Sequence, residues 1–263
     1  MNPAAGFITA AVLWLFSAGA VWAASPTGEM PDSQKRYVTT DDSLRLYAWY
    51  TPSPDRKAPL ILLLPMMAHT HESYDPFIRA VTEYRDADSA RATQPMPHLL
   101  SFDLRGHGES VIRGSDTLHW RTLDTAEFAK YPGDVKAMVN ALLSEHGEAI
   151  DTGNIIVIGA SIGANTAIML SAIMPGVSTV VMLSPGENYH GMQPAEAVKG
   201  FRGRGYIFAA TEDKYTAESS MDLLEINQEH FMLYMFRGGD HGTDIINKEP
   251  RAMAKLLEWL FPE

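Results

Sequence analysis

The 263-residue sequence contains no cysteine. The chain therefore forms no disulfide, and it offers neither a thiol nucleophile nor a thiolate ligand for a metal. Enzyme classes that depend on cysteine are excluded. Stability must come from a hydrophobic core, which a content of 46% hydrophobic residues can supply.

Positive charge is also scarce. The chain has 21 Lys and Arg residues against 32 Asp and Glu residues, which gives a formal net charge of −11 and a pI of about 5.2. This balance disfavours nucleic acids and anionic membrane surfaces as partners.

The first 24 residues carry no charged side chain, and residues 7–20 are nearly all apolar. Val21 and Ala23 provide small residues at the −3 and −1 positions of a signal-peptidase site. We therefore predict a signal peptide over residues 1–23 and an exported protein, periplasmic or secreted. The alternative is an uncleaved membrane anchor over residues 7–23, since the run approaches the roughly 20 residues that span a bilayer.

The pattern after residue 23 predicts a linker at 24–34 and one domain at 35–263. Two alternating runs at 35–40 and 44–50 indicate an antiparallel pair of strands. Short, continuously apolar runs then predict buried parallel strands at 60–64, 98–103, 155–159, 177–183, 206–210 and 231–236. Helices are expected between them, at roughly 74–92, 132–146, 162–173, 216–227 and 250–260. This alternation predicts an α/β fold with a mostly parallel sheet of about eight strands, flanked by helices.

A serine stands between two glycines where the predicted strand 155–159 becomes a helix. The stretch is GASIGAN, with Ser161 at its centre. Reactive groups gather at the carboxyl ends of parallel strands, and Gly159 and Gly163 allow a sharp turn with close backbone approach. The helix that follows favours negative charge at its amino end. Ser161 is therefore the candidate nucleophile.

A serine hydroxyl needs a base, and the base needs an orienting carboxylate. Asp213 follows the strand at 206–210, and His241 follows the strand at 231–236 in a glycine-flanked loop. The order Ser161, Asp213, His241 is that of the α/β-hydrolase triad. Glu187 is the competing acid, while Asp240 is poorly placed because it adjoins His241 in sequence.

These motifs resemble the α/β-hydrolase superfamily, in particular its dienelactone-hydrolase-like and small-esterase branches. GASIGAN resembles the nucleophile elbow, ATED the acid turn, GGDHGTD the histidine loop and FDLRGHGES, residues 102–110, a further family signature. The resemblance covers roughly residues 35–262. It implies that His107 and its neighbours build a structural loop near the active-site rim, not a catalytic group.

The sequence departs from the family after the strand at 60–64, where many relatives carry a His-Gly pair. Pro65 and Met66 stand there instead. By the resemblance, the backbone amides of Ile162 and of Met66 or Met67 form the oxyanion hole, because proline has no N–H to donate. The choice between the two methionines stays open.

His69, His71 and Glu72 invite a metal interpretation, but a metal site needs three or four ligands and no companion cluster follows. A loop bordering the substrate pocket is the better interpretation, and neither a metal nor another cofactor is expected. About 22 residues separate the strand at 177–183 from that at 206–210, so any lid is minimal.

The predicted function is a serine hydrolase that cleaves small-molecule carboxylic esters through an acyl-enzyme. No membrane partner is expected for the mature domain unless the amino-terminal segment is retained. Two alternatives remain: a catalytically silent binding protein with the same fold, and an acyltransferase or peptidase that uses the same triad.

Overall fold

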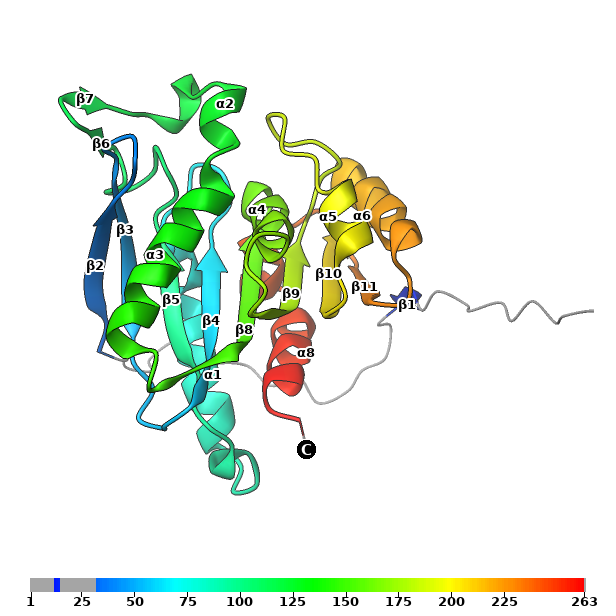
Figure 1. The fold of residues 1–263 in the computed structure, drawn as a ribbon. Helices are drawn as coiled ribbons and strands as arrows, with labels where there is room; N and C mark the ends of the chain where they lie inside the picture. The colour runs from blue at the N-terminus through cyan, green and yellow to red at the C-terminus, as the bar shows by residue number, and fades with distance from the viewer. Residues whose placement is uncertain (1–11, 15–31, 263) are drawn as a thin grey trace, which may run out of the picture.

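A nine-stranded sheet runs through the middle of the computed structural model, which describes residues 12–14 and 32–262 (Figure 1). The strand order is β1-β11-β10-β9-β8-β4-β5-β3-β2. Neighbours from β1 to β5 pair in parallel, whereas β3 pairs antiparallel with β5 and with β2. The strands are β1 (Val12–Trp14), β2 (Gln34–Thr39), β3 (Arg45–Thr51), β4 (Ala58–Leu64), β5 (His98–Phe102), β8 (Ile150–Ala160), β9 (Val177–Leu183), β10 (Arg204–Ala210) and β11 (Phe231–Phe236).

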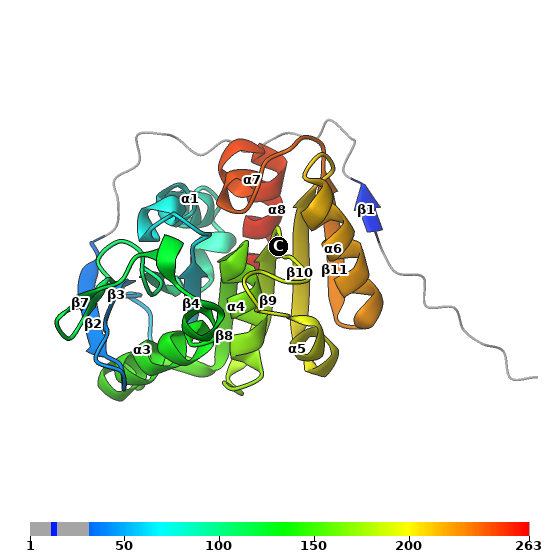
Figure 2. The same cartoon turned by 90° about the horizontal axis from the view of Figure 1, so that it is seen from above.

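Helices cover both faces of this sheet (Figures 1 and 2). One face packs against α3 (Tyr131–His146), α4 (Ile162–Ser171), α5 (Ala195–Gly200) and α6 (Lys214–Ile226). The opposite face packs against α1 (Asp75–Asp86), α7 (Thr243–Lys248) and α8 (Pro250–Leu260). A short helix α2 (Thr125–Phe128) and a two-stranded hairpin, β6 (Ile112–Arg113) and β7 (Asp116–Thr117), lie at the top of the molecule in the view of Figure 1.

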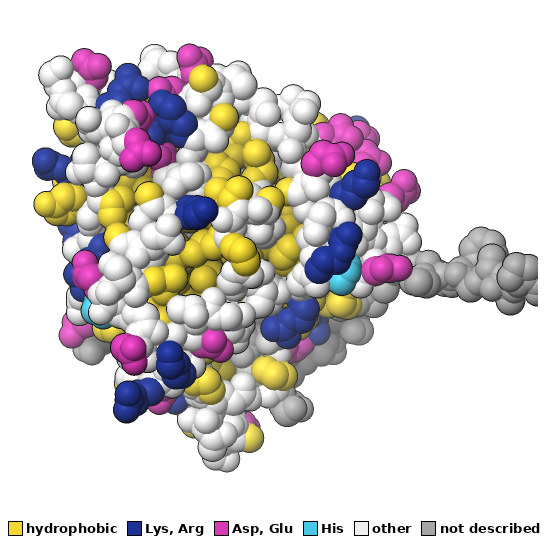
Figure 3. Space-filling view, viewed as in Figure 1, with side chains coloured by type: hydrophobic (Ala, Val, Ile, Leu, Met, Phe, Trp, Pro, Cys, Tyr) yellow, Lys and Arg dark blue, Asp and Glu magenta, His cyan; other side chains and the backbone are white. Residues whose placement is uncertain are grey.

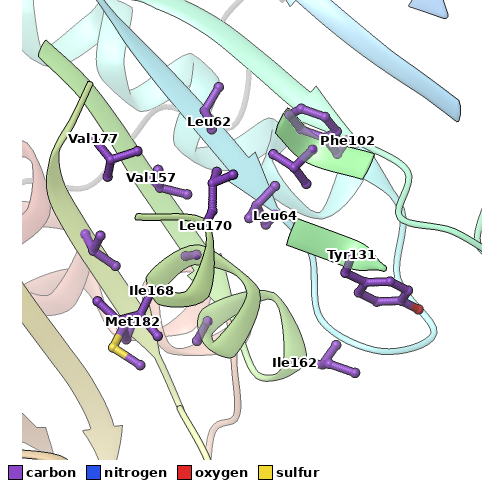
Figure 4. Close-up of a cluster of buried hydrophobic side chains, with 14 of the residues drawn as sticks. Leu62, Leu64, Phe102, Tyr131, Val157, Ile162, Ile168, Leu170, Val177 and Met182 are labelled. Carbon is purple, nitrogen blue, oxygen red and sulfur yellow. The ribbon is translucent and has the colours of Figure 1, made fainter. Parts of the chain in front are cut away.

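The continuous apolar strands are explained by these two layers. On β4, Leu60, Leu62 and Leu64 enter the cluster under α3 and α4, while Ile61 and Leu63 enter the cluster under α1 and α8. All five are fully buried. Figure 4 shows the first cluster, in which side chains from β4, β8, β9 and α4 meet. A strand with alternating polarity could not occupy this position.

The structure confirms the predicted α/β class, the antiparallel pair β2–β3 and the six buried strands. The helix expected at 74–92 is too long, since α1 ends at Asp86. The reason is Asp88, whose Oδ1 accepts hydrogen bonds from the amides of Ala90 and Arg91 and starts a separate turn. The 3-10 turn Arg91–Thr93 follows.

Figure 3 shows the face that carries α3 and α4. Hydrophobic side chains gather near its middle, and charged side chains lie mainly around the rim.

Most of the predicted signal segment lies outside the described residues, as do linker residues 24–31. The exception is Val12–Trp14, which pairs in parallel with Leu233–Met235 at the sheet edge. Among the described residues, no helix is long and apolar enough to cross a membrane. The signal peptide, the alternative anchor and the domain boundaries stay predictions.

Candidate active site

Ser161 stands in a strained turn at the carboxyl end of β8. Its φ of 54° and ψ of −118° lie in a region that residues with a Cβ rarely adopt. Its amide donates to the Leu183 carbonyl oxygen at 2.8 Å, and its carbonyl accepts from the Ala164 amide at 2.9 Å. These bonds hold the turn between β9 and the first turn of α4.

The two flanking glycines are required by close backbone contact. A Cβ on Gly159 would lie 2.0 Å from the Gly163 carbonyl oxygen. A Cβ on Gly163 would lie 2.4 Å from the Leu64 carbonyl oxygen and 2.6 Å from that of Pro65. Because all of these neighbours are backbone atoms, they cannot rotate away as a side chain would. The elbow therefore lies directly against the end of β4.

Asp213 and His241 are brought together from two neighbouring strands. The Asp213 Oδ2 and His241 Nδ1 atoms are 2.6 Å apart. Because an ionised carboxylate only accepts, Nδ1 carries the proton, and the lone pair of Nε2 is available to a serine. The loops are tied to each other where the Glu212 amide donates to the Gly238 carbonyl oxygen at 2.8 Å. The Asp213 side chain is 18% exposed and that of His241 38%.

The other two candidate acids, Glu187 and Asp240, have other contacts. Glu187 is exposed, and its amide donates to the Ser219 hydroxyl at 3.2 Å. The Asp240 carboxylate faces Lys248 Nζ at 3.8 Å. Of the three acids considered, Asp213 is the one in contact with His241.

Ser161 is not hydrogen-bonded to His241 in the part of the chain that the structure describes. Tyr189 lies near this serine: burial raises the pKa of the Tyr189 phenol, and the Ser161 hydroxyl acts in the opposite direction. The Tyr189 hydroxyl itself donates to the Ser184 carbonyl oxygen at 3.2 Å. Catalytic hydrogen bonds are often long before substrate binds. The triad assignment therefore stays a prediction, with its acid and base already in contact.

Sequence reasoning missed a group of residues behind the elbow. Ser184 follows β9 with a φ of 52°, and its hydroxyl accepts from the Gly242 amide at 2.9 Å, one residue after His241. The buried Asn165 of α4 donates to the carbonyl oxygens of Gly186 and Met192 at 2.8 and 2.9 Å. These bonds fix the loop that carries Tyr189. Only the asparagine in GASIGAN stood inside a recognisable motif.

The loop after β4 contacts both the elbow and the histidine loop. Met66 is buried, and its sulfur would lie 2.6 Å from a Cβ on Gly242. Ile162 is the first residue of α4, so its amide is among those that have no partner inside the helix. Oxyanion donors from Ile162 and from Met66 or Met67 stay a prediction that this proximity supports.

The residues considered for a metal have other contacts. His71 Nδ1 lies 2.9 Å from Asp103 Oδ1, and its ring stacks on Trp49 at 3.4 Å between centroids. His69 Nδ1 lies 3.0 Å from the Met67 carbonyl oxygen. Within residues 12–14 and 32–262, no group of three or more His, Asp or Glu side chains is placed to hold a metal ion.

The sequence matches a known protein family. A model of the alpha/beta hydrolase family matches residues 61–256, about three quarters of the chain. No curated protein matches the sequence.

Several solved structures share the fold at low sequence identity. An esterase of Pyrococcus furiosus superposes with a TM-score of 0.65 at 16% identity, covering 87% of this chain and 90% of that one. A dienelactone hydrolase of Anabaena variabilis gives 0.63 at 16% identity, covering 88% and 96%. A predicted CIB-like hydrolase of Thermoplasma acidophilum gives 0.62 at 14% identity, covering 88% and 99%.

Proposed function

The chain belongs to the alpha/beta hydrolase family, and on that premise we propose that it is a serine hydrolase that cleaves carboxylic esters through an acyl-enzyme. The observation that carries the proposal is the 2.6 Å contact between Asp213 and His241, together with a strained serine at the carboxyl end of β8 in the same parallel sheet. The esterase and the dienelactone hydrolase that share the fold support the same class of reaction.

In the first half-reaction the Ser161 Oγ attacks the ester carbonyl carbon while His241 Nε2 takes the hydroxyl proton. Asp213 holds the imidazole in the required tautomer and stabilises the imidazolium that forms. The carbonyl oxygen becomes negative and is stabilised by the amides of Ile162 and of Met66 or Met67. The intermediate collapses as His241 returns the proton to the leaving alcohol. In the second half-reaction His241 takes a proton from water, which attacks the acyl carbonyl carbon. The ester bond to Ser161 then breaks, His241 returns the proton to the Ser161 Oγ, and the carboxylic acid is released.

The segment between β9 and β10 bears on the substrate. It runs from residue 184 to 203 and contains one short helix, α5. Asn165 of α4 holds the first part of this segment by hydrogen bonds to the carbonyl oxygens of Gly186 and Met192. A short, clamped segment cannot fold over a long acyl chain as a mobile lid does, so the proposed substrates carry short or medium acyl groups.

The test is turnover of p-nitrophenyl acetate, butyrate and decanoate by the full chain and by Ser161→Ala. The variant should keep only the acceleration that binding and the oxyanion hole provide, on the order of 10³-fold over water. Ser171→Ala, at the far end of α4, is the matched control and should behave as wild type. Turnover by Ser161→Ala close to that of wild type would overturn the proposal.

A further inference from the structure

The loop Pro65–Thr70, called here the oxyanion loop, needs an external anchor. It contains no glycine, yet Ala68 has a φ of 64°, in the left-handed region that disfavours residues with a Cβ. The Ala68 amide donates to His107 Nε2 at 3.1 Å. Ala68 itself is exposed, so this bond crosses from the surface loop to a buried ring.

The bond defines the tautomer of His107. Its Nδ1 atom lies 3.1 Å from the Arg105 carbonyl oxygen, which can only accept, so Nδ1 carries the proton. Nε2 then has the free lone pair that the Ala68 amide needs. The ring is 3% exposed and stacks on Trp120. Burial lowers the pKa of His107 and favours this neutral form.

Arg105, whose carbonyl oxygen accepts from His107, is held by several further hydrogen bonds. The Arg105 carbonyl oxygen also accepts from the Tyr131 hydroxyl at 3.0 Å. The Arg105 guanidinium is 1% exposed and hydrogen-bonds to Asp42, Glu127 and Asp134 at 2.6 to 3.1 Å. The acceptor for His107 therefore has little freedom to move.

A second anchor fixes His71, the residue directly after the loop, to the same segment. Asp103 Oδ1 accepts from the His71 amide at 2.9 Å, and Oδ2 accepts from the Glu109 amide at 2.8 Å. Gly108 leaves room for this carboxylate, because a Cβ there would lie 1.9 Å from Oδ2. Residues 103–109 thus hold the oxyanion loop at Ala68 and also hold His71, the residue that directly follows the loop.

We propose that His107 is a positioning residue for the oxyanion hole: its neutral imidazole holds the Ala68 amide and so sets the direction of the Met66 and Met67 amides toward the reacting carbonyl. The inference rests on the proposed esterase function. In this proposal His107, within FDLRGHGES, has a role in turnover beyond the structural role that the family resemblance implies.

Two variants separate the two bonds of the ring. His107→Asn keeps an amide at the position of Nδ1 and loses the acceptor for Ala68, whereas His107→Gln places an amide oxygen near the position of Nε2. We expect H107N to lower kcat about 10- to 100-fold with a smaller change in KM, because misplacing an oxyanion donor affects the transition state more than the bound substrate. H107Q should recover most of that loss.

Turnover is measured with p-nitrophenyl butyrate and expressed per active site, counted by fluorophosphonate titration, so that a partly folded variant is still compared correctly. Leu142→Ala, in the buried face of α3, controls for lost stability and should keep wild-type kcat per site. H107N at wild-type kcat, or H107Q as impaired as H107N, would overturn the inference. A wild-type chain without turnover would instead refute the proposed function.

Discussion

Replacing Gly163 by alanine tests the contact between the elbow and the end of β4. The new Cβ would lie 2.4 Å from the Leu64 carbonyl oxygen, whereas ordinary contact begins near 3.4 Å. The end of β4 must therefore move by about 1 Å, and the oxyanion loop follows it directly. Overpacking of this kind lowers the free energy of unfolding by about 1–3 kcal/mol, and a displacement of about 1 Å near reacting atoms lowers kcat about 100-fold.

Gly133→Ala is the matched control. Gly133 lies inside α3, and a Cβ there would meet no heavy atom within 4 Å among the described residues. Alanine is the better helix former, so this variant should gain about 0.5–1 kcal/mol with unchanged turnover. Urea unfolding and p-nitrophenyl butyrate turnover are measured on both variants. Wild-type stability and turnover in G163A would refute the packing argument.

Three further outcomes are expected. Asp213→Asn keeps the shape of the acid but presents the wrong hydrogen-bonding partner to His241, and should lower kcat on the order of 10⁴-fold in steady-state assays. Tyr189→Phe removes the hydroxyl that donates to the Ser184 carbonyl oxygen, and should lower the free energy of unfolding by about 0.5–1.5 kcal/mol in urea titrations. Burial lowers the pKa of His98 from 6.5, so the unfolded chain binds a proton that the folded chain does not. The free energy of unfolding should therefore fall as pH falls from 7.5 to 5.5, by up to about 1.4 kcal/mol from this residue, and His98→Gln should show a smaller fall.

Most of the fold was predictable because its strands are buried on both faces. Leu60 to Leu64 form a run that suits only a strand covered on both sides, and the antiparallel pair β2–β3 alternates as a sheet edge should. The short helix α7 was missed, since six residues in a loop show no period. The end of α1 depended on the Asp88 side chain, which competes with the helix for backbone amides.

The candidate site was predictable where motif and strand order coincide. Ser161, Asp213 and His241 each follow a strand, and parallel strands end at one edge. The bond between the Ser184 hydroxyl and the Gly242 amide was not predictable, because it joins residues that are 58 positions apart in the sequence. The role of His107 depends on a hydrogen bond that its ring accepts from the Ala68 amide, 39 residues away in the sequence. No local sequence pattern indicates such a bond.

The proposed function requires Ser161 to be an activated nucleophile. The most direct measurement is the intact mass of the full chain and of Ser161→Ala after treatment with a fluorophosphonate. We expect one adduct on the wild-type chain and none on the variant. An unmodified wild-type chain, or an equal adduct on both proteins, would contradict it.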